Sequence, residues 1–194
     1  MSSRSLGIAA TGMQAQQENV DRIANNLANV NTTSFKKSRT DFQDLLYQTI
    51  KKPGDATSVN SENPVGVQFG VGVQNASTSK VFTPGGLKET GRNLDLAIKG
   101  EGFFSIQLPN GQVAYTRDGS FRMSANRTLE TSDGFPVVPA INVPAGTVGI
   151  TIDQSGQVIA RDDSNAENNV GQMQLFNFVN PSGLDPLGGN LYMP

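Results

Sequence analysis

The sequence has 194 residues, of which 16% are charged, with 21 Gly and 10 Pro, a composition that predicts many turns and short strands rather than a helical bundle. Its formal net charge of -2 gives no electrostatic reason to expect nucleic-acid binding. The absence of Cys and His excludes cysteine nucleophiles, thiolate or histidine metal sites and Ser-His-Asp triads, so we expect no catalytic site, metal or cofactor.

The first predicted element is a helix over residues 3–30. Two series of residues, each spaced by seven and offset by three, occupy the a and d positions of about four heptads: Leu6, Met13, Val20 and Leu27, and Ala9, Gln16, Ile23 and Val30. This spacing predicts a coiled-coil-type assembly seam made by the six large apolar residues Leu6, Met13, Val20, Ile23, Leu27 and Val30. The alternative is an ordinary amphipathic helix that lies on its own domain.

No later segment repeats the heptad pattern. The partner of the seam is therefore the β-rich body, another copy of the chain, or a segment outside this sequence. The apolar run at the N-terminus is short and interrupted by Gly7 and Gly12, so it predicts neither a secretory signal nor a membrane span.

Residues 35–66 form a predicted connector that follows the turn at 31–34. Its large apolar residues include Leu45, Leu46, Tyr47 and Ile50, and Pro53 interrupts the run. Residues 41–50 are compatible with a short helix or an extended apolar strip, and the polar stretch that continues to Pro64 is loop-like. So many large apolar residues argue against a flexible linker, and we expect the connector to dock on a neighbouring surface.

Residues 67–194 change to short runs with a period of two, which predicts a β-rich body. Pro109-Asn110-Gly111 and Ser155-Gly156 are typical of hairpin turns. The predicted strands are Val67–Val73, Ser79–Thr83, Leu94–Lys99, Phe103–Leu108, Val113–Arg117, Phe121–Met123, Val137–Val143, Gly149–Ile152, Val158–Arg161 and Gln172–Val179. The predicted fold is mainly β with an N-terminal helix (α+β), in which a compact, barrel-like or sandwich body follows the helix (1–34) and the connector (35–66).

Other classes of protein remain as alternatives. A glycan-binding module would use exposed aromatic residues such as Tyr115 and Phe135. A hydrolase would need paired carboxylates, and no two are placed in a predictable cleft. We interpret Phe103 and Phe104 as one core residue and one surface or interface residue.

Three motifs resemble those of bacterial flagellar rod and hook proteins: ANNLANVNTTSFKK at 24–37, DLAIKGEGFF at 95–104 and YTRDGSFR at 115–122. Within that family, DLLYQTIKKPG at 44–54 and the closing GGNLYMP are most similar to subunits of the distal rod. Hook and proximal rod subunits are the alternatives.

The resemblance implies a structural subunit that assembles with itself into a helical, hollow drive shaft, which transmits motor torque to the hook. The implied partners are proximal rod proteins, the hook protein, the rod cap and the bushing ring proteins. The implied location is a periplasm-spanning rod in the basal body, reached by type III export without a cleaved signal peptide. The resemblance also implies that Leu45, Leu46, Tyr47, Ile50 and Pro53 belong to a segment that stiffens the rod. Family members end in a C-terminal helix, which is not found before Pro194.

Overall fold

The computed structural model describes residues 2–54, 56–58, 61–62 and 64–194. These residues group into two compact units. Unit 1 comprises Met1–Asn31 and Lys36–Val81, and unit 2 comprises Thr32–Phe35 and Phe82–Pro194. The predicted division at residues 34 and 66 remains a prediction.

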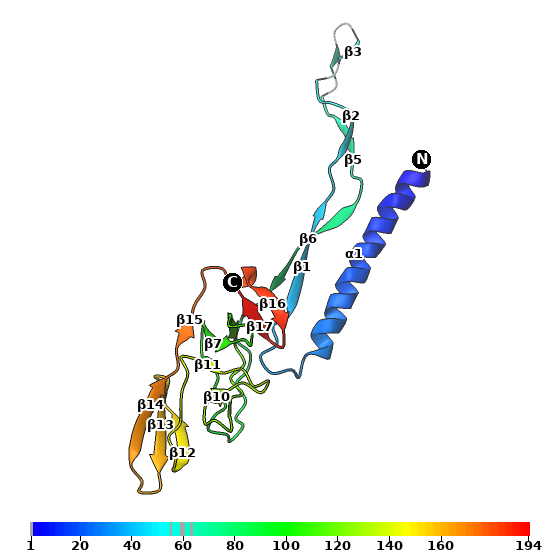
Figure 1. Cartoon of the computed structure of the whole chain (residues 1–194). Coiled ribbons are helices and arrows are strands. Elements are labelled where there is room, and N and C mark those ends of the chain that lie inside the picture. Colours follow the sequence, from blue (N-terminus) through cyan, green and yellow to red (C-terminus); the bar gives the residue numbers. More distant parts are fainter. Residues whose placement is uncertain (1, 55, 59–60, 63) are drawn as a thin grey trace. The chain divides into compact units, whose positions relative to one another are not determined.

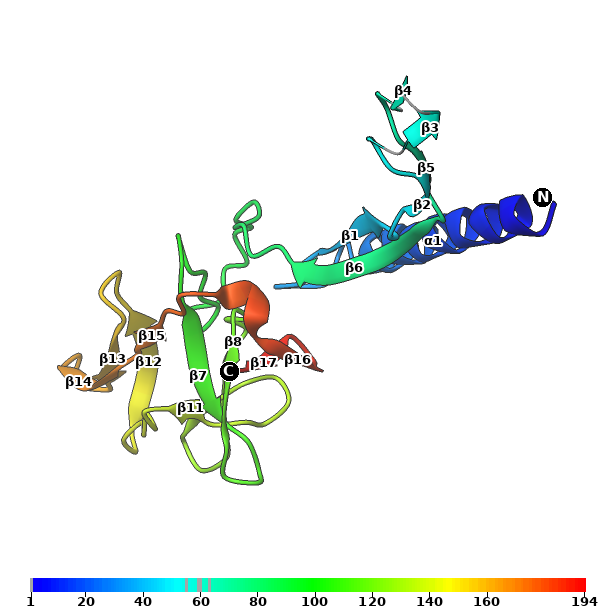
Figure 2. The ribbon, with the colours of Figure 1, turned by 90° about the horizontal axis from the view of Figure 1, so that it is seen from above.

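Unit 1 is a helix that runs beside an antiparallel β ribbon (Figures 1 and 2). The ribbon, which we call the β arm, consists of three successive strand pairs: β1–β6, β2–β5 and β3–β4. The elements are α1 (Ser2–Ala28), β1 (Ser38–Asp44), β2 (Gln48–Lys51), β3 (Ala56–Ser58), β4 (Ser61–Glu62), β5 (Val67–Phe69) and β6 (Val73–Lys80).

The β arm resolves the two possibilities left open for residues 41–50. Most of this stretch is extended, in β1 and β2, because residues 67–80 supply the partner strands. The polar stretch before Pro64 was expected to be a loop, but it contains the short pair β3–β4. Residues 55, 59, 60 and 63 of that stretch lie outside the described residues.

Unit 2 is built from open sheets. The largest has the strand order β11-β7-β8-β17-β16, with β15 also paired to β7, and a second has the order β12-β13-β14. The elements are β7 (Phe103–Gln107), β8 (Val113–Thr116), β9 (Arg122–Met123), β10 (Leu129–Glu130), β11 (Val137–Val138), β12 (Thr147–Ile152), β13 (Gln157–Asp162), β14 (Glu167–Gln172), β15 (Leu175–Phe176), the short 3-10 helix η1 (Pro181–Gly183), β16 (Asp185–Gly188) and β17 (Leu191–Met193).

The α+β class and the two hairpins are confirmed. Residues 109–111 connect β7 to β8, and Ser155-Gly156 lies between β12 and β13. The barrel is not formed, because the described sheets remain open. Leu94–Lys99 is not a strand either: Asp95 makes an isolated bridge to Ser120, while Leu94, Leu96 and Ile98 pack against the core.

Apolar clusters cover both faces of the central strand β7. Phe103 belongs to a cluster with Leu184 and Tyr192, whereas Phe104 packs on the other face in a larger cluster with Phe121. Successive side chains of a strand point to opposite faces, so both phenylalanines are buried only because both faces are covered. The prediction that one of them lies at the surface is therefore wrong.

Candidate functional site: the outward face of the N-terminal helix

The apolar stripe of α1 is exposed along its whole length. The side chains of the six residues predicted as the assembly seam are between 58% and 69% exposed, and they are Leu6, Met13, Val20, Ile23, Leu27 and Val30. Five of them lie within α1, and Val30 follows in the turn, where its N–H donates to the Leu27 carbonyl. We call this surface the seam face.

The opposite face of α1 packs against β1 and β6. Ala15 is only 9% exposed. Thr11, Glu18 and Asn26 on the same side of the helix are partly buried and form hydrogen bonds with the β1–β6 pair, which we call the hairpin. The Thr11 hydroxyl accepts from the Val73 N–H at 3.5 Å. Within its unit the helix thus packs through small and polar residues, and its apolar stripe stays exposed.

The surface beside the packed face is polar. A polar groove of about 410 Å³ lies beside it, lined by Glu18, Asp21, Arg22, Asn25, Ser38 and Asn75. Asn75 donates to the Glu18 carboxylate at 3.3 Å in an exposed position. Exposed polar contacts of this kind stabilise the helix only weakly. They give no packing role to the apolar residues on the other side of the helix.

The size of the seam face indicates an interaction surface. Full burial of one Val, Leu, Ile or Met side chain contributes about 1.5–3 kcal/mol. Burial of the six seam residues against a partner would therefore stabilise an assembly strongly. Contiguous exposed apolar surface of this kind marks protein–protein or membrane contact sites. In the described part of the chain, no helix is both long and apolar enough to cross a membrane.

The β arm exposes a second set of apolar side chains. Leu46 is 91% exposed, Tyr47 and Ile50 are also exposed, Leu45 is half-buried, and Pro53 lies at the surface where β2 has ended. A hydrogen bond to the Asp44 carboxylate, aided by the charge of that group, raises the pKa of Tyr47 above its ordinary value.

Gly66 allows the two strands of the arm to approach each other near Pro53. A Cβ at residue 66 would lie 2.8 Å from both the Lys51 carbonyl oxygen and the Pro53 Cδ. We therefore expect Gly66→Ala to open the β2–β5 pair, because one obstacle is a backbone oxygen and the other is a proline ring atom that cannot rotate away from the backbone. Backbone amide exchange of Gln68 should accelerate. The matched change Gly70→Ala, whose Cβ would make only an ordinary contact of 3.7 Å with the Tyr47 ring, should leave the exchange of Gln68 unaltered. Unchanged exchange in Gly66→Ala would contradict this account.

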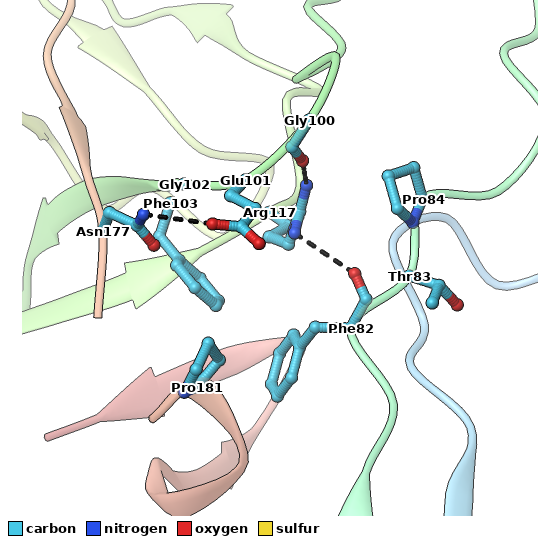
Figure 3. Close-up of a pocket in the computed structure, with 10 residues that line it drawn as sticks. All are labelled: Phe82, Thr83, Pro84, Gly100, Glu101, Gly102, Phe103, Arg117, Asn177 and Pro181. Atoms are coloured by element: carbon cyan, nitrogen blue, oxygen red, sulfur yellow. Dashed lines mark hydrogen bonds between the residues drawn. The ribbon is translucent and has the colours of Figure 1, made fainter. Parts of the chain in front are cut away.

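Unit 2 contains a cavity of about 280 Å³, drawn in Figure 3. Arg117 reaches across it and donates to the backbone carbonyls of Phe82 (3.3 Å) and Gly100, with its guanidinium 5.6 Å from the centre of the Phe103 ring. Partial burial of this group lowers the pKa of Arg117, while the Glu101 carboxylate acts in the opposite direction. Arg117 therefore braces the chain where it enters unit 2, a role that sequence reasoning missed although the residue lies in the motif at 115–122.

The cavity has no arrangement for acid–base chemistry. Glu101 is the single carboxylate among the described residues that line it, and it accepts from the Asn177 side chain at 3.3 Å. In the described part of the chain, no group of three or more acidic side chains is placed to hold a metal ion.

The aromatic residues considered for glycan binding lie apart from each other. Tyr115 packs edge-on against Phe176 and Phe178, in the cluster around Phe103. Phe135 packs in a different cluster, around Ile106. They do not form a shared aromatic platform.

Comparison with known proteins gives two family matches. Residues 6–36 match the family described as flagella basal body rod protein, and residues 97–160 match the flagellar hook protein FlgE/F/G D1 domain. The flagellar basal-body rod protein FlgG of Buchnera aphidicola subsp. Schizaphis graminum is 46% identical over 97% of this chain and 73% of its own length. That of Borreliella burgdorferi is 47% identical over 97% of this chain and 72% of its own. The flagellar hook protein FlgE of Helicobacter mustelae is 44% identical, but over 69% of this chain and only 30% of its own length.

Proposed function

Since the chain belongs to the family of flagellar basal-body rod proteins, we propose that the seam face of α1 is the surface through which copies of it assemble. The FlgG relatives indicate that the chain is a structural subunit of the flagellar distal rod and not an enzyme. It is located in the flagellar basal body, where it assembles with related rod and hook proteins. In our proposal the copies form a helical, hollow shaft that transmits motor torque to the hook.

One observation carries the proposal: the helix uses its small and polar face within its own unit and leaves its apolar face exposed. Exposed apolar residues spaced by seven and offset by three suit packing against other helices. The proposed partners of the seam face are the helices of neighbouring subunits, packed in the manner of a coiled coil. We propose that this contact joins two different surfaces of neighbouring copies. A contact of that type need not close on itself and can therefore build a filament.

The β arm has a supporting role in the proposal. Two-stranded ribbons are marginally stable alone, so the exposed Leu46, Tyr47 and Ile50 are expected to gain order by packing between subunits. With Leu45 and Pro53 they form the proposed stiffening segment. We further propose that the assembled rod spans the periplasm and contacts the proximal rod, rod cap, hook and bushing ring proteins. In this proposal each subunit is exported to the rod without a cleaved signal peptide.

A thiol-protection experiment tests the role of the seam face. The sequence contains no Cys, so a single substitution supplies the sole thiol. We expect Val20→Cys to react rapidly with a maleimide in the free subunit and to be protected about tenfold or more in rods isolated from motile cells, because packing excludes solvent and reagent. A surface position on the same helix that lies off the seam, Asp21→Cys, is the control for general crowding. Equal labelling of Val20→Cys in free subunits and rods would refute the proposal.

A further inference from the structure

The side chain of Asn26 makes two hydrogen bonds to the backbone of one residue in β1. Its Oδ1 accepts from the Ser38 N–H at 3.0 Å, and its Nδ2 donates to the Ser38 carbonyl at 3.0 Å. Both bonds are partly buried. In antiparallel ladders, alternate residues direct both backbone groups away from the paired strand, so the amide of Asn26 satisfies Ser38 as a neighbouring strand would.

The chemistry of this bridge is specific to an amide of this length. A carboxamide offers one acceptor and one donor group side by side, which matches the acceptor and donor of a peptide unit. Aspartate has the same shape but is ionised at neutral pH and only accepts, so its second oxygen would face the Ser38 carbonyl. Alanine would leave both backbone groups without these partners.

The hydrogen bonds of Asn26 to the hairpin are shorter than those of Thr11 and Glu18. The bond from Val73 N–H to the Thr11 hydroxyl is longer, at 3.5 Å, and that from Asn75 to Glu18 is exposed and 3.3 Å long. Asn26 lies in the last turn of α1, directly before Leu27 of the seam face. Since each helical residue turns by about 100°, fixing one residue against β1 determines the direction of every other side chain on the helix.

We propose that Asn26 is a positioning residue for assembly: its bridge to Ser38 fixes the rotation of α1 about its axis and holds the seam face away from the hairpin. The proposal rests on the role of the seam face proposed above. It assigns Asn26 no contact with a neighbouring subunit. Its effect on assembly passes through the orientation of residues such as Ile23 and Leu27.

The first test measures the orientation of the helix in the free subunit. In separate proteins, Ala15→Cys reports the packed face and Ile23→Cys reports the seam face. With Asn26 present, we expect the thiol of Ala15→Cys to react with a maleimide at least about tenfold more slowly than the thiol of Ile23→Cys. The reason is that Ala15 is 9% exposed and Ile23 is 58% exposed. Adding Asn26→Asp should bring the two rates within about threefold of each other, as the helix is no longer held by one face.

Asn25→Asp is the matched control. It makes the same chemical change one residue earlier, at an exposed position, and should keep the full difference in rate. Amide exchange of Ser38 should accelerate in Asn26→Asp and Asn26→Ala but not in Asn25→Asp. Circular dichroism of each purified variant checks that it is folded. If Asn26→Asp fails to fold, Asn26→Ala becomes the test variant.

The second test measures rod assembly by the full-length variants in cells. We expect Asn26→Asp to reduce assembly although all six seam residues are intact, and Asn25→Asp to assemble normally. Unchanged labelling ratios in Asn26→Asp and Asn26→Ala would overturn the proposal, as would altered ratios with fully normal assembly. Failure of the underlying function is a separate result: in that case Val20→Cys stays equally reactive in rods, whatever the labelling of the Asn26 variants shows.

Discussion

Leu27→Asp should abolish rod assembly while leaving the subunit folded. Leu27 is largely exposed in the subunit and lies in the last turn of α1, so replacing it removes no contact of the core. In an assembled rod the same side chain would be enclosed by apolar neighbours. Burial of an unpaired carboxylate costs several kcal/mol, and the cost recurs at every subunit of the filament.

The measurement has two parts. Swimming in soft agar and electron microscopy of isolated basal bodies report assembly, and urea unfolding of the purified protein reports stability. Asn25→Asp introduces the same charge on the same helix but off the seam face, so it should support motility. Leu27→Met keeps an apolar side chain and should also assemble. Motile cells with normal rods built from the Leu27→Asp protein would contradict the assigned role of the seam.

Gly119→Ala should strongly destabilise unit 2. Gly119 is buried, and a Cβ there would collide with the Leu96 carbonyl group, whose carbon atom would lie 2.7 Å away. The obstacle is backbone, and it is fixed in place by the hydrogen bond from the Leu96 N–H to the Gly119 carbonyl at 2.9 Å. Overpacking at a site that cannot relax costs about 1–3 kcal/mol or more, a large part of the stability of a small domain.

Urea unfolding followed by far-UV circular dichroism measures this effect, and we expect a clear fall in the midpoint for the β body. Gly85→Ala is the matched control, because a Cβ at residue 85 meets nothing within 4 Å. Its midpoint should equal that of the parent chain within error. A Gly119→Ala protein with the parent midpoint would show that the loop around Leu96 adapts more easily than its hydrogen bonds indicate.

The turns of unit 2 show where local sequence is sufficient. Asn110-Gly111 and Ser155-Gly156 sit at hairpin turns as predicted, because residues that tolerate a positive φ determine tight turns by themselves. The strand assigned to Leu94–Lys99 shows the opposite case. Its alternating pattern suits a strand, but the segment lies over the core beside Gly119 and finds no complete strand partner.

The sequence alone determined the helix, its apolar spacing and the family, because heptads and contiguous motifs are local properties of the chain. The tertiary structure decided that residues 38–51 pair with residues 67–80, since strand pairing depends on partners distant in sequence. It also decided which face of α1 turns toward the hairpin. The apolar stripe would have suited either its own domain or other subunits, and polar contacts of Thr11 and Asn26 with the hairpin leave it exposed.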